Sequence, residues 1–138
     1  MEKGIESRVH FAGNVMIDSL MRHVPRAVPP RETLERAGGD ASYAGPPGFA
    51  VVTLHRPSNV DDRVALAESL RILEDVSERL PVIWPVHPRT AANLARFGLE
   101  SSIEAEGDIR AVTPMPYGET MALLREAAAM ARACAPGV

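Results

Sequence analysis

The sequence predicts an α/β protein in which helices flank a parallel β-sheet. Two apolar segments, residues 51–54 and 82–86, each end abruptly in a histidine accompanied by arginine and proline. This pattern is typical of buried parallel strands that present polar groups to a ligand at their carboxyl ends. Segments with strand and helix character alternate along the chain, which favours right-handed crossovers. A length of 138 residues, 46% of them hydrophobic, suits one domain with a modest core.

The first part of the chain is expected to hold a helix and a connector. Residues 8–13 form a short apolar-alternating piece, and a helix capped by Asn14 is predicted to end before Pro25. Prolines and glycines recur through residues 25–47, which predicts a connector with one short polar helix at residues 31–37.

The remainder is expected to alternate strands with helices. Strands are predicted at residues 49–54, 82–86 and 109–112. Helices are predicted at residues 61–80, at residues 89–97 with Gly98 as the stop, and from Tyr117 onward. Because residues 119–135 are rich in alanine, this last helix is expected to continue to Pro136, and no fourth strand is predicted.

Composition excludes several classes of function. A net charge of −3, from 15 basic and 18 acidic residues, provides no basic field for nucleic acid. Cys134 is the only cysteine, which excludes an internal disulfide and fits a reducing cytoplasm. No signal-peptide-like or membrane-spanning apolar segment occurs, so we expect a cytoplasmic protein without a membrane partner.

Common catalytic and cofactor motifs do not occur in the chain. The sequence contains no Gly-x-Gly-x-x-Gly, Walker loop, His-Glu-x-x-His or Gly-x-Ser-x-Gly. Two histidines alone do not make a metal site, so neither a cofactor nor a metal ion is expected.

The first motif is His55-Arg56-Pro57, which leaves the predicted strand just before a helix begins. Helix amides, a histidine able to carry charge and an arginine fork all favour phosphate oxygens, so this motif predicts an anion pocket. The alternative is structural: the histidine caps the strand, and Arg56 pairs with Asp61 or Asp62.

The second and third motifs follow the next two strands. His87 lies between Pro85 and Pro88, and Arg89 and Thr90 then open a helix. His87 comes 32 residues after His55 (87 − 55), the length of one βαβ unit, so we expect both clusters at adjacent strand ends. A single histidine in this setting is commonly structural.

Residues 114–117, Pro-Met-Pro-Tyr, form the third motif. Two prolines hold an extended turn whose backbone groups can read a planar base, and Tyr117 can line the same crevice. The alternative is an ordinary loop with a half-buried tyrosine. His10 and His23 are expected to be surface or packing residues.

Taken together, these motifs resemble a known family. Residues 11–20 (FAGNVMIDSL), 52–61 (VTLHRPSNVD), 85–90 (PVHPRT) and 114–117 (PMPY) resemble, in order, the successive motifs of the non-hydrolysing UDP-N-acetylglucosamine 2-epimerases. The similarity runs from about Arg8 to about Glu126. Each motif alone is weak, but their shared order and spacing make the resemblance specific.

The resemblance implies a glycosyltransferase-B-type fold, in which two Rossmann-like lobes hold the nucleotide sugar between them. The chain would be a truncated second lobe, with a partial Rossmann-like parallel sheet and flanking helices. The implied organisation is a crossover helix region at residues 1–24, a Pro/Gly-rich connector at 25–48 and a partial UDP-binding lobe at 49–138.

The resemblance also implies site residues. The histidine matching His55 lies near the diphosphate and is the catalytic candidate. The implied substrate-binding residues are Arg56, Asn59, His87, Arg89, Pro114 and Tyr117. The loop at residues 114–117 is expected beside the uracil. The chain departs from the family pattern at Thr120, where an aromatic residue is common, and at residues 127–138, which replace a Ser-Gly-Gly loop.

The implied activity is isomerase chemistry: UDP-N-acetylglucosamine and its manno isomer interconvert through elimination and re-addition of UDP. The family's acid and base carboxylates belong to the first lobe, so Asp61, Asp62 and Glu119 are not assigned to those roles. The chain alone is therefore expected to be inactive. Two alternatives stay open: a non-catalytic UDP-binding or interaction module, and a structural remnant held by a partner. An uncovered sheet edge favours a homo-oligomer or a partner that supplies the missing lobe.

Overall fold

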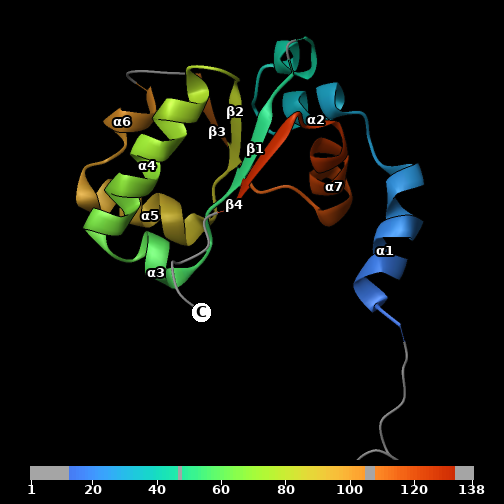
Figure 1. Cartoon of the computed structure of the whole chain (residues 1–138), viewed down its shortest axis with the longest axis horizontal. Helices are drawn as coiled ribbons and strands as arrows, with labels where there is room; N and C mark the ends of the chain where they lie inside the picture. The colour runs from blue at the N-terminus through green and yellow to red at the C-terminus, as the bar shows by residue number, and fades with distance from the viewer. Residues whose placement is uncertain (1–12, 47, 105–107, 133–138) are drawn as a thin grey trace, which may run out of the picture.

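The computed structural model describes residues 13–46, 48–104 and 108–132. Its centre is a parallel sheet with the strand order β3-β2-β1-β4 (Figure 1). The strands are β1 (Ala50–Thr53), β2 (Val82–Pro85), β3 (Ile109–Val112) and β4 (Ala129–Arg132). The predicted α/β class, with its parallel sheet and flanking helices, is thus confirmed.

Helices cover both faces of the sheet, and Figure 1 shows these layers on either side of the strands. One layer contains α3 (Pro57–Val60), α4 (Arg63–Ser77), α5 (Pro88–Phe97) and α6 (Ser101–Glu104). The other contains α2 (Pro30–Arg36), η3 (Ala41–Ala44) and α7 (Tyr117–Glu126). Beyond α7 lie α1 (Val15–His23) and η2 (Val24–Arg26), and α1 contacts α7 (Figure 1).

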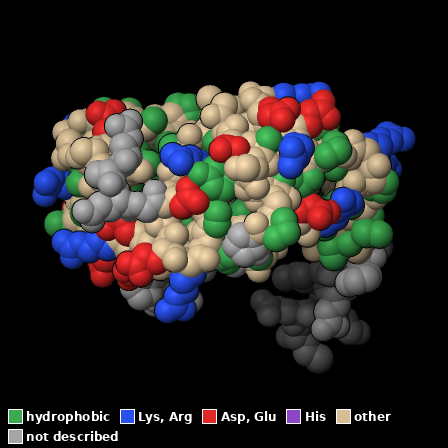
Figure 2. All heavy atoms as spheres, turned by 90° about the horizontal axis from the view of Figure 1, so that it is seen from above, with side chains coloured by type: hydrophobic (Ala, Val, Ile, Leu, Met, Phe, Trp, Pro, Cys, Tyr) green, Lys and Arg blue, Asp and Glu red, His purple; other side chains and the backbone are tan. Residues whose placement is uncertain are grey.

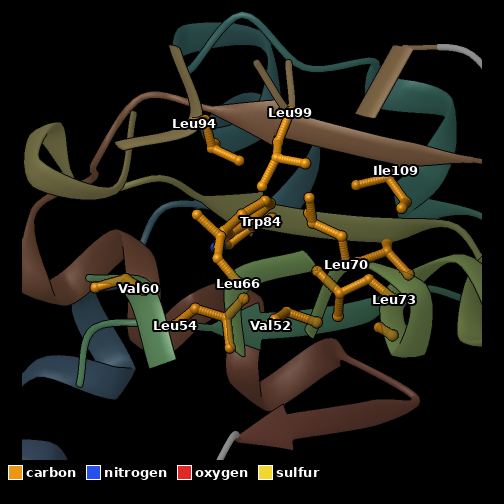
Figure 3. Packing of buried hydrophobic residues seen from close by; sticks show 12 residues of the cluster. Val52, Leu54, Val60, Leu66, Leu70, Leu73, Trp84, Leu94, Leu99 and Ile109 are labelled. Atoms are coloured by element: carbon orange, nitrogen blue, oxygen red, sulfur yellow. The ribbon is translucent and has the colours of Figure 1, made fainter. Parts of the chain in front are cut away.

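Successive side chains of a strand point to opposite faces of the sheet, so alternate residues pack into two separate hydrophobic cores. On the α4 side, Val52 and Trp84 pack with leucines such as Leu70, and Figure 3 shows Trp84 at the centre of this cluster. On the opposite side, Val51 and Ile83 pack with apolar residues of α2 and α7. Burial on both faces explains why β1 and β2 lie in continuous apolar runs of the sequence.

The helix boundaries follow from local capping. Asn14 caps α1 by accepting a hydrogen bond from the Met16 amide at 3.0 Å, as predicted. Asp62 caps α4 through the Val64 and Ala65 amides, both at 2.9 Å. Gly98, with φ at +67°, ends α5 in the left-handed conformation that glycine tolerates. The residues that signal these ends can therefore be read from the sequence.

The segment predicted as a connector contains packed structure. Leu34 of α2 is fully buried in the core formed with α7, so the predicted short helix is confirmed and lies on the sheet. The predicted alternating piece falls almost entirely within residues 1–12, outside the described residues. None of the helices in the described ranges has both the length and the apolarity needed to cross a membrane.

The predicted continuous helix over residues 119–135 is wrong, because α7 ends at Glu126 and β4 follows. The Ala128 amide donates to the Phe49 carbonyl at 2.9 Å, and β4 then pairs with β1 from Ala50–Ala129 to Thr53–Arg132. Alanine has the highest helix propensity of all residues, but propensity differs by less than about 1 kcal/mol per residue, and pairing along a whole strand of the central sheet outweighs it. The chain therefore contains a fourth strand that composition does not predict.

Candidate active site

The topology brings the three predicted motifs to one edge of the sheet. Because β1, β2 and β3 are parallel neighbours, the segments that follow them emerge side by side at their carboxyl ends. These segments are residues 54–56, 86–88 and 113–116, and the edge faces downward in Figure 1. The expected placement of His55 and His87 at adjacent strand ends is confirmed.

The order of the strands singles out the end of β1. The chain runs from β1 through α4 to β2, but from β3 it crosses the other face through α7 and returns to β4 on the far side of β1. Strand order thus reverses between β1 and β4. In open α/β sheets, ligands bind in the crevice at such a switch point. His55 and Arg56 follow β1 directly, so they lie at this crevice.

Arg56 is a cation without an acidic partner among the described residues. It is partly buried and occupies the N-cap position of α3, whose first residue is Pro57. The Arg56 side chain makes no capping hydrogen bond. Asp61 pairs with Arg89 instead, and Asp62 caps α4. The alternative in which Arg56 pairs with either aspartate is therefore not realised. The charge of Arg56 remains available to an anion.

His55 and Asn59 flank this arginine. The His55 side chain is exposed, and Leu54 before it is buried in the core. Asn59 lies on α3, is partly buried and accepts a hydrogen bond from the Ser58 hydroxyl at 3.3 Å. The buried Leu54 thus fixes the chain just before the exposed imidazole of His55 and the half-buried guanidinium of Arg56.

His87 and Arg89 are held by structural contacts. His87 is exposed and caps α5, because its Nδ1 accepts the Arg89 amide at 3.2 Å. Arg89 donates through Nε to Asp61 Oδ1 at 2.8 Å and pairs through Nη2 with Oδ2. The Thr90 hydroxyl, fully buried, donates to the Leu54 carbonyl at 3.4 Å. His87 thus has a structural contact, and the contacts of Arg89 and Thr90 tie α5 to the segment that carries His55.

The loop after β3 leads into α7. Pro114 is exposed, and Tyr117, 46% exposed, is the first residue of α7 and lies edge-on to His23 with ring centroids 5.7 Å apart. The Thr120 hydroxyl donates back to the Pro116 carbonyl at 3.2 Å. A pocket of about 310 Å³ lies beside the tyrosine. It is lined by Val15, Met16, Ser19, His23 and Tyr117. Sequence reasoning did not foresee this neighbour from α1, because nothing local links the two segments.

A tyrosine with a shifted pKa lies at the opposite edge of the sheet. Burial and a hydrogen bond to Asp108 raise the pKa of Tyr43, and Arg110 donates to the Tyr43 hydroxyl at 2.8 Å. Asp108 immediately precedes β3, which places this cluster at the amino edge of the sheet. Figure 2 views that face, where acidic and basic side chains intermingle and no histidine of the described residues is visible. The described residues contain no group of three or more potential metal ligands.

The chain is similar in sequence to known epimerases that act on UDP-sugars. A model of the protein family described as UDP-N-acetylglucosamine 2-epimerase matches residues 1–134. The chain is 31% identical over 120 residues to the UDP-2,3-diacetamido-2,3-dideoxy-D-glucuronate 2-epimerase of Pseudomonas aeruginosa, covering 86% of this chain and 29% of that protein. It is 25% identical over 130 residues to the UDP-N-acetylglucosamine 2-epimerase of Methanococcus maripaludis, covering 92% and 35%.

Solved structures extend this similarity to the fold. The UDP-GlcNAc 2-epimerase of Methanocaldococcus jannaschii matches with a TM-score of 0.75 at 22% identity, over 92% of this chain and 35% of that one. A crystal structure of the M. jannaschii enzyme in complex with UDP-GlcNAc and UDP matches with a TM-score of 0.67 at 21% identity, over 92% and 34%. The chain spans about a third of the length of the relatives it matches. Since the family match covers nearly all of its residues, the chain belongs to the UDP-N-acetylglucosamine 2-epimerase family.

Proposed function

We propose that this chain is the UDP-holding portion of a UDP-sugar 2-epimerase and binds the diphosphate at the carboxyl edge of its sheet. The observation that carries the proposal is Arg56, a half-buried guanidinium without an acidic partner among the described residues. It lies beside His55 at the topological switch point. Parallel strand ends, an arginine fork and an imidazole together favour a phosphate-bearing ligand.

The proposed reaction interconverts UDP-N-acetylglucosamine and its manno isomer. UDP is eliminated to leave a glycal and is then added back with C2 inverted. Such a reaction needs an acid–base pair at the sugar and stabilisation of the departing diphosphate. His55 and Arg56 suit the second task. Relatives act on differently substituted sugars, as the P. aeruginosa protein indicates, whereas UDP is common to their names.

Three carboxylates of the described residues are already engaged in contacts. Asp61 pairs with Arg89, Asp62 caps α4, and Glu119 lies 3.4 Å from the Arg36 guanidinium. The chain aligns with about a third of the length of its relatives. We therefore assign the catalytic acid and base to the remaining two thirds, which this chain does not match. Without those groups the chain loses proximity and preorganisation, so it should not turn over substrate alone.

The remaining site residues receive supporting roles in this proposal. Pro114 and Tyr117 lie by the uracil, Asn59 contributes from α3, and His87 shapes the crevice through its capping contact. The division into a helix region at 1–24, a connector at 25–48 and a UDP-binding lobe at 49–138 remains a prediction. So does a cytoplasmic location, which the single cysteine, Cys134, supports.

A second candidate is a non-catalytic module that binds UDP weakly and associates with another chain. Four exposed apolar side chains on α1 favour association, whether with a second copy or with a partner that supplies the other lobe. Its members are Val15 (73% exposed), Met16 (75%), Ile17 (56%) and Met21 (69%). In the described residues, only α7 and η2 make substantial contact with α1.

Titration with UDP, followed by backbone NMR, tests the proposal. We expect shifts for the amides of His55, Arg56 and Tyr117 and unchanged signals for Tyr43 at the opposite edge. Unchanged signals throughout would refute UDP binding. A parallel assay with UDP-N-acetylglucosamine should yield none of the manno isomer, and measurable turnover by the purified chain would show that the acid and base lie within it.

A further inference from the structure

We propose that Asp61 is a positioning residue that holds the turn carrying Arg56 and Asn59, and that Arg89 supports this turn instead of binding phosphate. The inference deepens the proposed function, because it rests on a UDP site at the carboxyl edge. It reassigns Arg89, which the motif pattern predicts as a substrate-binding residue.

Three side-chain contacts from α5 converge on the end of α3. The Arg89 guanidinium donates hydrogen bonds to both oxygens of the Asp61 carboxylate, from Nε to Oδ1 at 2.8 Å and from Nη2 to Oδ2. One helical turn later, the Asn93 amide donates to the Val60 carbonyl at 2.9 Å and to Asp61 Oδ1 at 3.2 Å. Two-point arginine–carboxylate contacts fix orientation as well as distance. The C-terminal end of α3 is therefore pinned to α5.

The same helix also holds the other end of this segment. Thr90 is fully buried, and its hydroxyl donates to the carbonyl of Leu54, the residue before His55. The first two turns of α5 thus contact the chain immediately before His55 and again at Val60 and Asp61. Residues 55–59 lie between these two attachment points, so their backbone is constrained from both sides.

Charge supports the same assignment. The Asp61 carboxylate neutralises Arg89, whereas Arg56 has no acidic partner among the described residues. A diphosphate arriving at the end of β1 therefore meets a guanidinium, that of Arg56, whose charge no acidic side chain of the described residues offsets. Contact with Arg89 as well would bring the diphosphate close to the Asp61 carboxylate, and this proximity of like charges is unfavourable.

The substitution Asp61→Asn distinguishes a positioning role of Asp61 from a phosphate-binding role of Arg89, because the two roles predict opposite changes in UDP affinity. If Asp61 positions the turn, the variant should bind UDP about two- to fivefold more weakly, as expected for loss of a partly exposed pair. If Arg89 is a phosphate ligand, its release from Asp61 should tighten binding. Arg89→Gln should weaken UDP binding by the same factor as Asp61→Asn, and the double variant should add little, since both changes remove one pair.

The control is Glu126→Gln, which breaks another exposed ion pair, that with Arg125 at the opposite end of α7. It should leave UDP affinity unchanged. Unchanged or tighter binding by Asp61→Asn, while the wild-type chain binds UDP, would overturn the positioning role and leave the proposed function intact.

Hydrogen exchange decides the structural part without UDP. The Asn59 amide donates to the Arg56 carbonyl at 3.0 Å, and the Asp61 amide donates to the Pro57 carbonyl at 2.9 Å. Both amides should exchange faster in Asp61→Asn than in the wild type and in Glu126→Gln. Equal exchange rates would overturn the inference. Failure of the wild-type chain to bind UDP, with faster exchange in the variant, would instead contradict the proposed function alone.

Discussion

Replacing Arg56 with glutamine removes the cation on which the proposed UDP site depends. Arg56 is partly buried and has no hydrogen-bond or ion-pair partner among the described residues, so its loss breaks no visible contact of the folded chain. The free energy of unfolding should therefore change by less than about 0.5 kcal/mol. The effect should appear in ligand binding alone.

The expected loss of affinity follows from the strength of charge-assisted hydrogen bonds. Such bonds contribute about 1.5–3 kcal/mol each. Since about 1.4 kcal/mol corresponds to a tenfold change, Arg56→Gln should weaken UDP binding by about 10- to 150-fold. Because the site is open to solvent, the wild-type affinity should also fall as salt is raised, and the variant should show a shallower dependence.

Isothermal titration calorimetry with UDP at two salt concentrations measures both quantities, and urea unfolding measures stability. The matched control is Arg79→Gln, because Arg79 is exposed, follows α4 at the amino edge and has no side-chain partner among the described residues. It should bind UDP like the wild type. Equal affinity of Arg56→Gln and wild type, or equal losses in both variants, would contradict the reasoning.

Other predictions concern stability and assembly. Leu70→Ala opens a cavity in the α4-side core and should cost about 2–5 kcal/mol of unfolding free energy in urea denaturation, whereas Ile72→Ala on the exposed side of the same helix should cost less than about 0.5 kcal/mol. Tyr43→Phe removes the hydrogen bond to Asp108 and should cost about 1 kcal/mol at neutral pH. The pKa of Tyr43 is higher in the folded than in the unfolded chain, so Tyr43 adds to the free energy of unfolding below the unfolded pKa of about 10, and this contribution is lost as pH rises through the folded pKa. Unfolding curves across this pH range should therefore show a smaller loss of stability at alkaline pH for Tyr43→Phe than for wild type. Light scattering should detect an oligomer whose mass falls on Met16→Glu, and a compact monomer at every concentration would contradict that association.

Much of the fold could be predicted because its signals are local. The strand β3 coincides with the predicted residues 109–112, and β1 and β2 fall within the predicted segments. Aspartate and asparagine caps and Gly98 mark helix ends through their own backbone chemistry. The parallel arrangement then follows from the alternation of strands and helices, and it brings the polar strand ends together.

The missed features depend on contacts between distant segments. The alanines of β4 carry no β-branched or aromatic signal, and only pairing with β1 makes them a strand. Because β4 is missed, the switch point beside His55 is missed as well. Asp61 and Arg89 lie 28 positions apart, and each charge has many possible partners in a linear chain. The sequence thus indicates the edge of the site, whereas packing decides which cation there is free.

A comparison of UDP with uridine tests the central claim most directly, because the two ligands differ only in the diphosphate. Chemical-shift mapping should show changes around residues 114–117 with both ligands. The amides of His55 and Arg56 should respond to UDP and remain unchanged with uridine. If His55 and Arg56 respond equally to both ligands, or to neither while residues 114–117 respond, the diphosphate does not lie at the end of β1.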